Sequence, residues 1–467
     1  MQQLSGTDTA FLTMETRTTY GHVGSLYEFG PEATYDAVRG QIENRLHLLP
    51  PFRRRLVEVP LGLDNPYWIE SLDFDLDFHI REIAVPAPGN REQLAELVAR
   101  LASRPMDRSR PLWEWYVISG LETGNVAHYA KTHHATIDGA SGNEMMTVLL
   151  DETPEPRPVP PPEGEWKPEE KPSDLNLLGR TMLNYARRPR HLARAQVRLM
   201  RELASRSTDP TMRRILEQSI RQMTQPVPNP LGDLFRRRGN DARDGDEAPP
   251  MPNTTAPRTM FNASITPHRR LAYCSVSLSD AKKVKNHFGV TLNDVVLAMC
   301  AGALRMYLED HHSLPTDPLI AMCPVSIRTG AETDTYSNRV SGMAAPLATH
   351  IDDPVERLMS IHRGTKVAKE QFNAIPADAL QDFGRFSPPA VAARASRVMA
   401  RMRIADRMNP PFNLVISNVP GPRHPLYLAG AMLQHLYPVS TIGDGMGLNM
   451  TVVSYRDQLD FGSVACR

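Results

Sequence analysis

Several features are scarce or missing in this sequence, and each absence excludes a class of protein. Its 467 residues include only four cysteines, without CxxC or other paired spacing and mostly in apolar runs, so we expect buried free thiols in a reducing compartment. Every apolar run is shorter than the roughly 18 residues that a membrane-spanning helix needs. The N-terminus lacks the basic region and apolar core of a signal peptide. These absences predict a cytoplasmic protein.

Neither sign of charge predominates. The 53 basic and 53 acidic residues give a formal net charge of +0. The global electrostatics therefore favour neither nucleic acid nor any other strongly charged partner.

Proline is plentiful, and its distribution divides the chain. The chain is too long for one core of usual size, and residues 1–150 mix strand-like and helical patterns. Asp151–Pro172 is rich in proline and glutamate and predicts an extended linker, and Pro226–Pro257 predicts a mobile loop. A second mixed segment follows. We therefore expect two subdomains, at residues 1–150 and 260–467, joined by a connection at 151–259.

The connection contains a strongly basic stretch. Arg180–Arg206 has eight arginines and one glutamate, with leucine, valine and methionine between them. This pattern predicts a basic amphipathic helix, interrupted near Pro189. Two interpretations stay open: a solvated helix packed on the subdomains, or peripheral attachment to a membrane.

Hydrophobic periodicity predicts elements in both mixed segments. The expected helices are Tyr35–Leu46, Arg91–Leu101, a helix that Ser279 caps and that ends near Gly289, and Thr291–Asp310. The expected strands are Val57–Val59, Asn125–His133, Arg270–Leu278, Leu319–Ile327, Asn413–Val419, Leu448–Tyr455 and Gln458–Ala465.

The stretch KTHHATIDGASG, residues Lys131–Gly142, carries the most chemical information. A strand is expected to end near His133, and a helix should follow, with Ser141 and Glu144 as its capping box. Two adjacent histidines therefore lie where a strand leads into a helix, a common position for functional loops. Histidine is also the side chain best suited to accept a proton near neutral pH.

Three interpretations of this stretch compete. A metal site is disfavoured because adjacent side chains on extended backbone diverge, and because no further ligand cluster accompanies the two histidines. A structural interpretation makes His133 a packed, hydrogen-bonded residue and makes Asp138 and Gly139 a turn. A catalytic interpretation makes one histidine a general base.

Further sequence blocks add a resemblance. HHATIDG is similar to the HHxxxDG motif of the condensation-domain and chloramphenicol-acetyltransferase-like acyltransferases. With its companion blocks, which follow in family order over nearly the whole chain, the sequence resembles the bacterial wax ester synthase/diacylglycerol acyltransferases. Members of that family usually continue into a C-terminal helix, whereas this sequence ends at FGSVACR. The companion blocks are LSGTDTAFL, the PLW motif at Pro111–Trp113, FNASITPHRRLAY, TLNDVVLA, PVSIR, NLVISNVPGP and GLNMTVVSY.

The resemblance implies an α/β fold. It consists of two chloramphenicol-acetyltransferase-like subdomains, each a mixed sheet flanked by helices, with the active site between them. It also implies transfer of a fatty acyl group from acyl-CoA, as co-substrate, to diacylglycerol or a long-chain alcohol, which would make triacylglycerol or wax ester. No cofactor, metal or nucleic acid is implied. The inner membrane face or a lipid-body surface is a possible peripheral location.

Two alternatives remain open from the sequence. One is a related condensation-type acyltransferase that uses another acceptor or a carrier-protein donor. The other is a non-catalytic lipid-binding scaffold, although such a scaffold needs no base.

Roles at the reaction centre follow from this resemblance and from acyl-transfer chemistry. An alcohol is a weak nucleophile, so a base must take its proton, and His134 is our candidate, with His133 in support. Asn293, in the first turn of the Thr291–Asp310 helix, is the candidate oxyanion donor.

Other residues are assigned to the architecture of the site. Asp138 is expected to pair with Arg328 and to hold the loop so that His134 faces the substrate channel. Gly139 should permit close backbone approach or a positive φ. For Asp294, two interpretations stay open: a cap of the helix together with Thr291, or a functional role.

Overall fold

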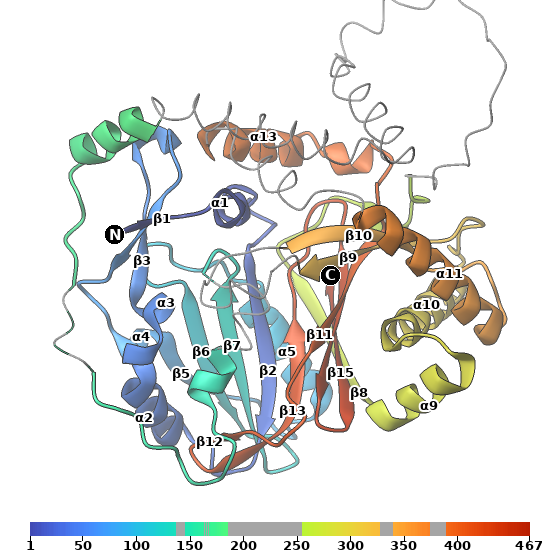
Figure 1. Ribbon diagram of the computed structural model, residues 1–467, viewed down its shortest axis with the longest axis horizontal. Coiled ribbons are helices and arrows are strands. Elements are labelled where there is room, and N and C mark those ends of the chain that lie inside the picture. Colours follow the sequence, from blue (N-terminus) through green and yellow to red (C-terminus); the bar gives the residue numbers. More distant parts are fainter. Residues whose placement is uncertain are drawn as a thin grey trace, which may run out of the picture.

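The computed structural model describes residues 1–136, 145–162, 164, 166, 168–184, 255–326, 340–373 and 389–467. These residues form two six-stranded sheets and a small sheet of three strands (Figure 1). The predictions for residues 185–206, for the loop up to residue 254, and for Asp138, Gly139, Ser141 and Arg328 lie outside the described residues.

The N-terminal sheet has the strand order β12-β13-β2-β7-β6-β5. Its neighbouring strands are antiparallel, except that β5 runs parallel to β6. The small sheet, in the order β1-β4-β3, lies beside it. The strands are β1 (Gln2–Gln3), β2 (His22–Phe29), β3 (Arg54–Val57), β4 (Tyr67–Glu70), β5 (Ile80–Ala84), β6 (Trp113–Ser119), β7 (Val126–His133), β12 (Tyr427–Leu428) and β13 (Ala431–Val439).

Helices of this half lie along the sheet and at its upper end (Figure 1). The longest, α5, begins at a capping box in which Asn90 accepts from the Gln93 N–H, and its buried Leu94, Val98 and Leu101 face the sheet core. The helices are α1 (Gly6–Thr13), α2 (Tyr35–Arg45), η1 (Leu46–Leu48), α3 (Pro50–Arg53), η2 (Pro60–Gly62), α4 (Leu76–His79) and α5 (Arg91–Ala102), with further helical stretches at 145–149 and 174–184.

The C-terminal sheet has the strand order β10-β9-β11-β14-β15-β8. Strand β11 runs parallel to both of its neighbours, so this sheet is mixed. Its strands are β8 (Arg269–Ser277), β9 (Ile320–Ser326), β10 (Val340–Pro346), β11 (Leu414–Pro420), β14 (Leu448–Tyr455) and β15 (Gln458–Cys466). The helical elements are η4 (Met260–Asn262), α9 (Leu278–Phe288), α10 (Leu292–Asp310), α11 (Pro354–Asn373), α13 (Pro389–Arg401) and η6 (Ile404–Asp406).

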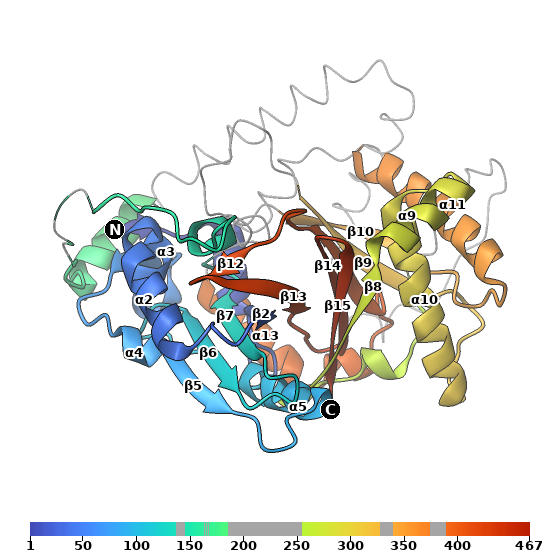
Figure 2. The same cartoon turned by 90° about the horizontal axis from the view of Figure 1, so that it is seen from below.

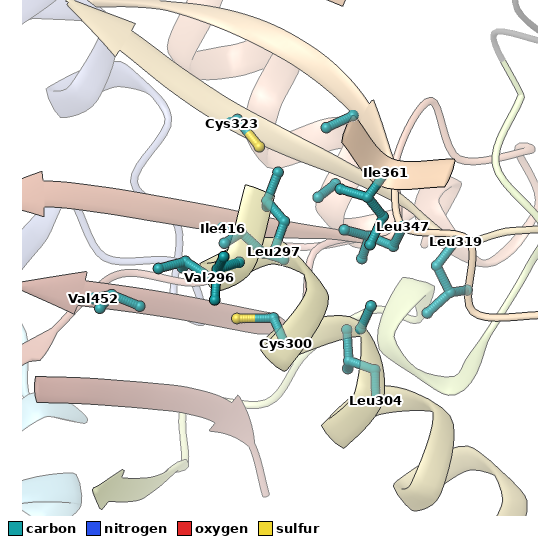
Figure 3. Close-up of a cluster of buried hydrophobic side chains, with 14 of the residues drawn as sticks. Val296, Leu297, Cys300, Leu304, Leu319, Cys323, Leu347, Ile361, Ile416 and Val452 are labelled. Atoms are coloured by element: carbon teal, nitrogen blue, oxygen red, sulfur yellow. The ribbon is translucent and has the colours of Figure 1, made fainter. Parts of the chain in front are cut away.

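Helix α10 is the central packing element of this half. Thr291 caps it, and its side chain accepts a hydrogen bond from the Asp294 N–H. The helix then packs its apolar face on one side of the sheet, where each fully buried aliphatic side chain stabilises the fold by about 1.5–3 kcal/mol (Figure 3). The cluster drawn in Figure 3 includes Val296, Leu297, Cys300, Leu304, Leu319, Cys323, Leu347, Ile361, Ile416 and Val452.

The boundary between the two large sheets does not coincide with the expected subdomain boundary at residue 260. Strands β12 and β13 come from the C-terminal segment, yet β13 pairs with β2 and completes the N-terminal sheet (Figure 2). Strand β13 also packs against β15, and an added Cβ at Gly462 would overlap the Pro438 carbonyl oxygen. The expected subdomain at 260–467 therefore contributes one strand pair to its partner, and this crossing joins the halves.

Most predicted elements are present with shifts of a few residues at their ends. One cap was wrong: Ser277, not Ser279, accepts from the Asp280 N–H at the start of α9. The strand expected at Asn413–Val419 is present as β11, which runs from Leu414 to Pro420.

Among the described residues, no single helix is long and apolar enough to cross a membrane. Helices α9 and α10 pass that test only as a pair, bent by 107°.

Candidate active site

His134 lies immediately after β7, where the strand ends. Its backbone N–H donates to the carbonyl oxygen of Gly21, directly before β2, at 2.8 Å, and this bond fixes the position of the residue. The Phe11 ring stacks on the imidazole with centroids 4.0 Å apart and an interplanar angle of 6°. Phe11 belongs to α1, which Ser5 caps by accepting from the Asp8 N–H. The LSGTDTAFL block thus builds the helix that holds an aromatic ring against His134.

His133 makes a different set of contacts. Its ring is buried, and Nδ1 accepts from the Ala135 N–H at 3.0 Å. The ring proton therefore lies on Nε2, which donates to Glu15 Oε1 at 3.2 Å. Glu15 also pairs with Arg108 at 2.6 Å. His133 is thus packed and hydrogen-bonded, as the sequence predicted.

Glu15 is held in its charged form by this network. Burial raises the pKa of Glu15, but His133, Arg108 and the Gly21 N–H outweigh that effect and lower the pKa to about 2. Gly21 leaves room for the network, because an added Cβ there would lie 2.7 Å from His133 Nε2. The result is a rigid support behind the histidine pair.

A cavity of about 220 Å³ opens beside His134. One wall comes from β2, β6, β7 and β13 of the N-terminal sheet, and the other from β11 and β14 of the C-terminal sheet, with the 145–149 helix over one side. His134 is among its lining residues, whereas His133 is not. The cavity therefore lies between the two halves of the molecule, where the active site was expected.

The cavity changes character along its length. Thr132 lies at the histidine end of the cavity, because alternate residues of the chain share one side. The strand register brings Ser440, directly after β13, to the same end, and its Oγ is 2.7 Å from Thr451 Oγ1. Strand register places apolar side chains further along β2, β6 and β7. This arrangement suits a molecule with a polar reacting group and a long apolar chain. The apolar lining includes Tyr27, Phe29, Phe52, Trp113, Trp115, Met145, Met146, Leu149 and Leu150.

Asn293 does not belong to this cavity lining. Its side-chain oxygen is 3.5 Å from the Asn418 amide nitrogen, a long hydrogen bond. On β11, Ser417 and Val419 line the cavity, and Asn418 between them points to the opposite face, where α10 packs. Strand β11 thus separates Asn293 from the cavity, and this geometry gives the predicted oxyanion role no support.

Asp294 joins two helices. It is fully buried, and its carboxylate accepts from Thr365 Oγ1 at 2.7 Å and from the Thr291 N–H at 2.9 Å, with His362 Nδ1 at 2.8 Å. Burial raises the pKa of Asp294, but the hydrogen bonds from Thr365, His362 and Thr291 outweigh it and lower the pKa. The predicted capping role is confirmed, and Asp294 also ties α10 to α11.

Sequence reasoning missed the support on the other side of β7. Lys131, the first residue of the motif stretch, is fully buried, and its ammonium group donates to Glu114 at 3.2 Å and to the Arg104 carbonyl oxygen at 2.7 Å. Burial lowers the pKa of Lys131. The only hint of this role in the local sequence is that Lys131 lies two residues before His133 and therefore on the same side of the strand.

Within the part of the chain that is described, no group of three or more His, Cys, Asp or Glu side chains is placed to hold a metal ion.

Comparison with known families decides the relationship. The model for the wax ester synthase/diacylglycerol acyltransferase catalytic domain matches residues 4–296, and that for the WS/DGAT C-terminal domain matches residues 336–467. The chain belongs to the wax ester synthase/diacylglycerol acyltransferase family. The predicted family and the predicted enzyme class, an acyltransferase, are thereby confirmed.

Relatives of the family align over almost the whole chain. A Mycobacterium tuberculosis protein named as a diacylglycerol O-acyltransferase is 37% identical, over 99% of this chain and 94% of its own. O-acyltransferase WSD of Acinetobacter baylyi is 34% identical, over 100% of this chain and 93% of its own.

Solved structures confirm the fold. The wax ester synthase/diacylglycerol acyltransferase of Marinobacter aquaeolei VT8 is 31% identical, with a TM-score of 0.63 over 100% of this chain and 93% of its own. The first condensation domain of the CDA synthetase is 14% identical, with a TM-score of 0.52 over 99% of this chain and 90% of its own, and shares the fold alone. The predicted α/β fold of two chloramphenicol-acetyltransferase-like halves is confirmed.

Proposed function

We propose that this acyltransferase moves a fatty acyl group from acyl-CoA to the hydroxyl group of diacylglycerol or of a long-chain alcohol, with His134 as the general base. The observation that carries the proposal is the position of His134 at the polar end of a largely apolar cavity between the two sheets. Family membership and the names of the relatives support the choice of acceptors.

The reaction needs one proton relay and no covalent enzyme intermediate. The imidazole of His134 takes the proton of the acceptor hydroxyl while its oxygen attacks the thioester carbonyl carbon. The tetrahedral intermediate then collapses, the carbon–sulfur bond breaks, and the proton passes from His134 to the departing CoA thiolate. The products are an ester and free CoA.

The surroundings of His134 fit this role. Phe11 stacks on one face of the ring, and the Gly21 carbonyl fixes the backbone, so the imidazole keeps one orientation toward the cavity. The apolar lining excludes water, which would otherwise compete with the acceptor for the thioester. The group that stabilises the oxyanion stays open, because Asn293 lies behind β11.

An acceptor panel tests the proposal. Purified protein receives labelled acyl-CoA with diacylglycerol or with hexadecanol, and ester formation is measured for the wild type and for His134→Ala. We expect acylation of at least one acceptor, and a loss of rate of about 10²–10⁴-fold in His134→Ala, the usual contribution of a general base.

The matched control is His424→Ala, which removes a half-exposed histidine outside the cavity lining. This variant should keep the wild-type rate. Full activity in His134→Ala would refute the base assignment, and acylation only with an acyl carrier protein as donor would refute acyl-CoA as co-substrate.

A further inference from the structure

Helix α13 presents its larger apolar side chains to solvent. At 100° per residue, four of these side chains fall within one sector of the helix and its C-terminal turn. Each is at least half exposed, although burial of such side chains is favourable. We call this set the apolar stripe: Val391 (58% exposed), Val398 (50%), Met399 (50%) and Met402 (52%).

The side of α13 away from the apolar stripe is built from small residues. Ala392, Ala393, Ser396 and Ala400 are half-buried. The helix packs on α1 and on η2, and an added Cβ at Gly62 would lie 3.0 Å from the Ala390 side chain. Small side chains allow this close approach. The helix is therefore anchored to the molecule through alanine, while the apolar stripe faces outward.

The two elements that support α13 also carry exposed apolar side chains. Leu61 in η2 is 83% exposed and has a φ of 59°, a left-handed conformation that costs free energy for leucine. Met14, directly after α1, is 48% exposed. Figure 1 shows α13 and α1 together along one side of the molecule.

Arginines accompany this surface. Residues 389–408 include five arginines and one aspartate, a net charge of +4. Arg394, Arg397 and Arg401 recur at intervals of three and four residues, which places them in a row directly beside the apolar stripe. All three are exposed. The chain as a whole is neutral, so this positive charge is local.

We propose that the apolar stripe, with Leu61, Met14 and the arginine row, is a docking surface for an anionic lipid membrane. An exposed helix with an apolar sector beside a row of arginines matches the chemistry of the headgroup boundary, where apolar side chains enter and the guanidinium groups meet lipid phosphates. The surface consists of described residues and is separate from the basic stretch Arg180–Arg206.

Docking here would place the reaction centre close to its substrates. Helix α13 lies on α1, and α1 carries Phe11, which stacks on His134. Helices α13 and α1 thus lie between the docked face and His134. This inference rests on the proposed function for its purpose, because diacylglycerol and long-chain alcohols reside in membranes.

Vesicle flotation of the full chain tests the surface. The vesicles contain phosphatidylcholine alone or equal parts of phosphatidylcholine and phosphatidylglycerol. We expect binding to the anionic vesicles, weakened by salt. The triple variant Arg394→Gln, Arg397→Gln, Arg401→Gln should bind about a hundredfold more weakly, and the double variant Val398→Ser, Met402→Ser about tenfold more weakly.

A matched control removes exposed apolar side chains elsewhere. Met306→Ser with Val355→Ser changes side chains that are 67% and 43% exposed on α10 and α11. It should float like the wild type, and thermal unfolding should show that every variant is folded. Equal flotation of wild type and both surface variants would overturn the proposal. So would a wild-type dimer that the Val398→Ser, Met402→Ser variant converts to monomers, since a second copy would then cover the surface.

Activity measurements distinguish a failure of the docking proposal from a failure of the proposed function. The surface variants should acylate a soluble short-chain alcohol at the wild-type rate but lose activity toward diacylglycerol in anionic vesicles. A chain that acylates nothing, yet floats as described, would refute the proposed function alone. Loss of both activities in the folded surface variants would refute the docking role.

Discussion

His133 and His134 are adjacent in the chain, yet their rings face different surroundings. Strand geometry sends neighbouring side chains to opposite sides, so His134 reaches the cavity and His133 reaches Glu15 behind it. The same divergence prevents the two rings from sharing a metal ion. At the scale of residues, one histidine can therefore work on a substrate while the other, with Glu15 and Arg108, holds the backbone.

The charge of Glu15 should contribute to stability in a defined pH range. Its pKa in the folded protein is about 2, below the ordinary value of 4.5. The contribution is therefore complete above pH 4.5 and is lost as the pH falls toward 2, with a magnitude on the order of 2–3 kcal/mol. Glu15→Gln should lower the free energy of unfolding near neutral pH by about this amount. Urea unfolding should show that the gap to wild type shrinks in acid; a constant gap would contradict the prediction.

Close approach of β13 and β15 depends on one glycine. An alanine at 462 would overlap the Pro438 carbonyl oxygen, a backbone atom that cannot turn away. Gly462→Ala should therefore lower the free energy of unfolding by about 3 kcal/mol. It should also reduce activity, because Pro438 lines the cavity.

Gly40→Ala is the matched control in denaturant unfolding. This glycine lies inside α2, with nothing within 4 Å of an added Cβ. Alanine there should stabilise the protein by about 0.5–1 kcal/mol. If both alanines changed stability alike, the close approach would not be the cause.

Elements with a local signal could be predicted, and elements defined by distant partners could not. The capping residues of α10 and the hydrophobic pattern of β14 predicted the bounds of these two elements to within one residue. Strand β6 was missed because Trp113–Ile118 is buried on both faces and shows no alternation. The HHxxxDG motif identified His134, but Phe11 and Glu15 reach the histidines only through tertiary contacts.

At the scale of the whole molecule, a polar cluster connects the two sheets. Ser275 on β8 donates to Asp460 on β15 at 2.6 Å, and its hydroxyl lies 3.2 Å from His435 on β13. Asp460 is fully buried and also accepts from the Leu436 N–H at 2.8 Å. Because β13 belongs to the N-terminal sheet, these contacts connect the two sheets. On the other side of β13, Leu436 and Pro438 line the cavity.

This cluster should make stability depend on pH near neutrality. The hydrogen bond and charge of Asp460, with Glu28, raise the pKa of His435 above 6.5, while burial and Arg91 oppose them; Tyr437 and Ser275 complete its surroundings. A raised pKa means that the stabilisation is complete below pH 6.5 and is lost as the pH rises through the folded-state pKa.

His435→Gln should therefore be less stable than wild type below pH 6.5, and the gap should shrink as the pH rises through the folded-state pKa of His435. Denaturant unfolding across this range measures the gap, and His424→Gln, which replaces a half-exposed histidine, serves as the control and should show a smaller change. A His435→Gln gap that widens with pH would mean that neutral His435 stabilises the contact, which would reverse the sign assigned to the Asp460 pair. If acyl transfer by His435→Gln is below that of wild type in the same pH range in which the variant is less stable, the contact between the two sheets also sets the shape of the cavity beside His134.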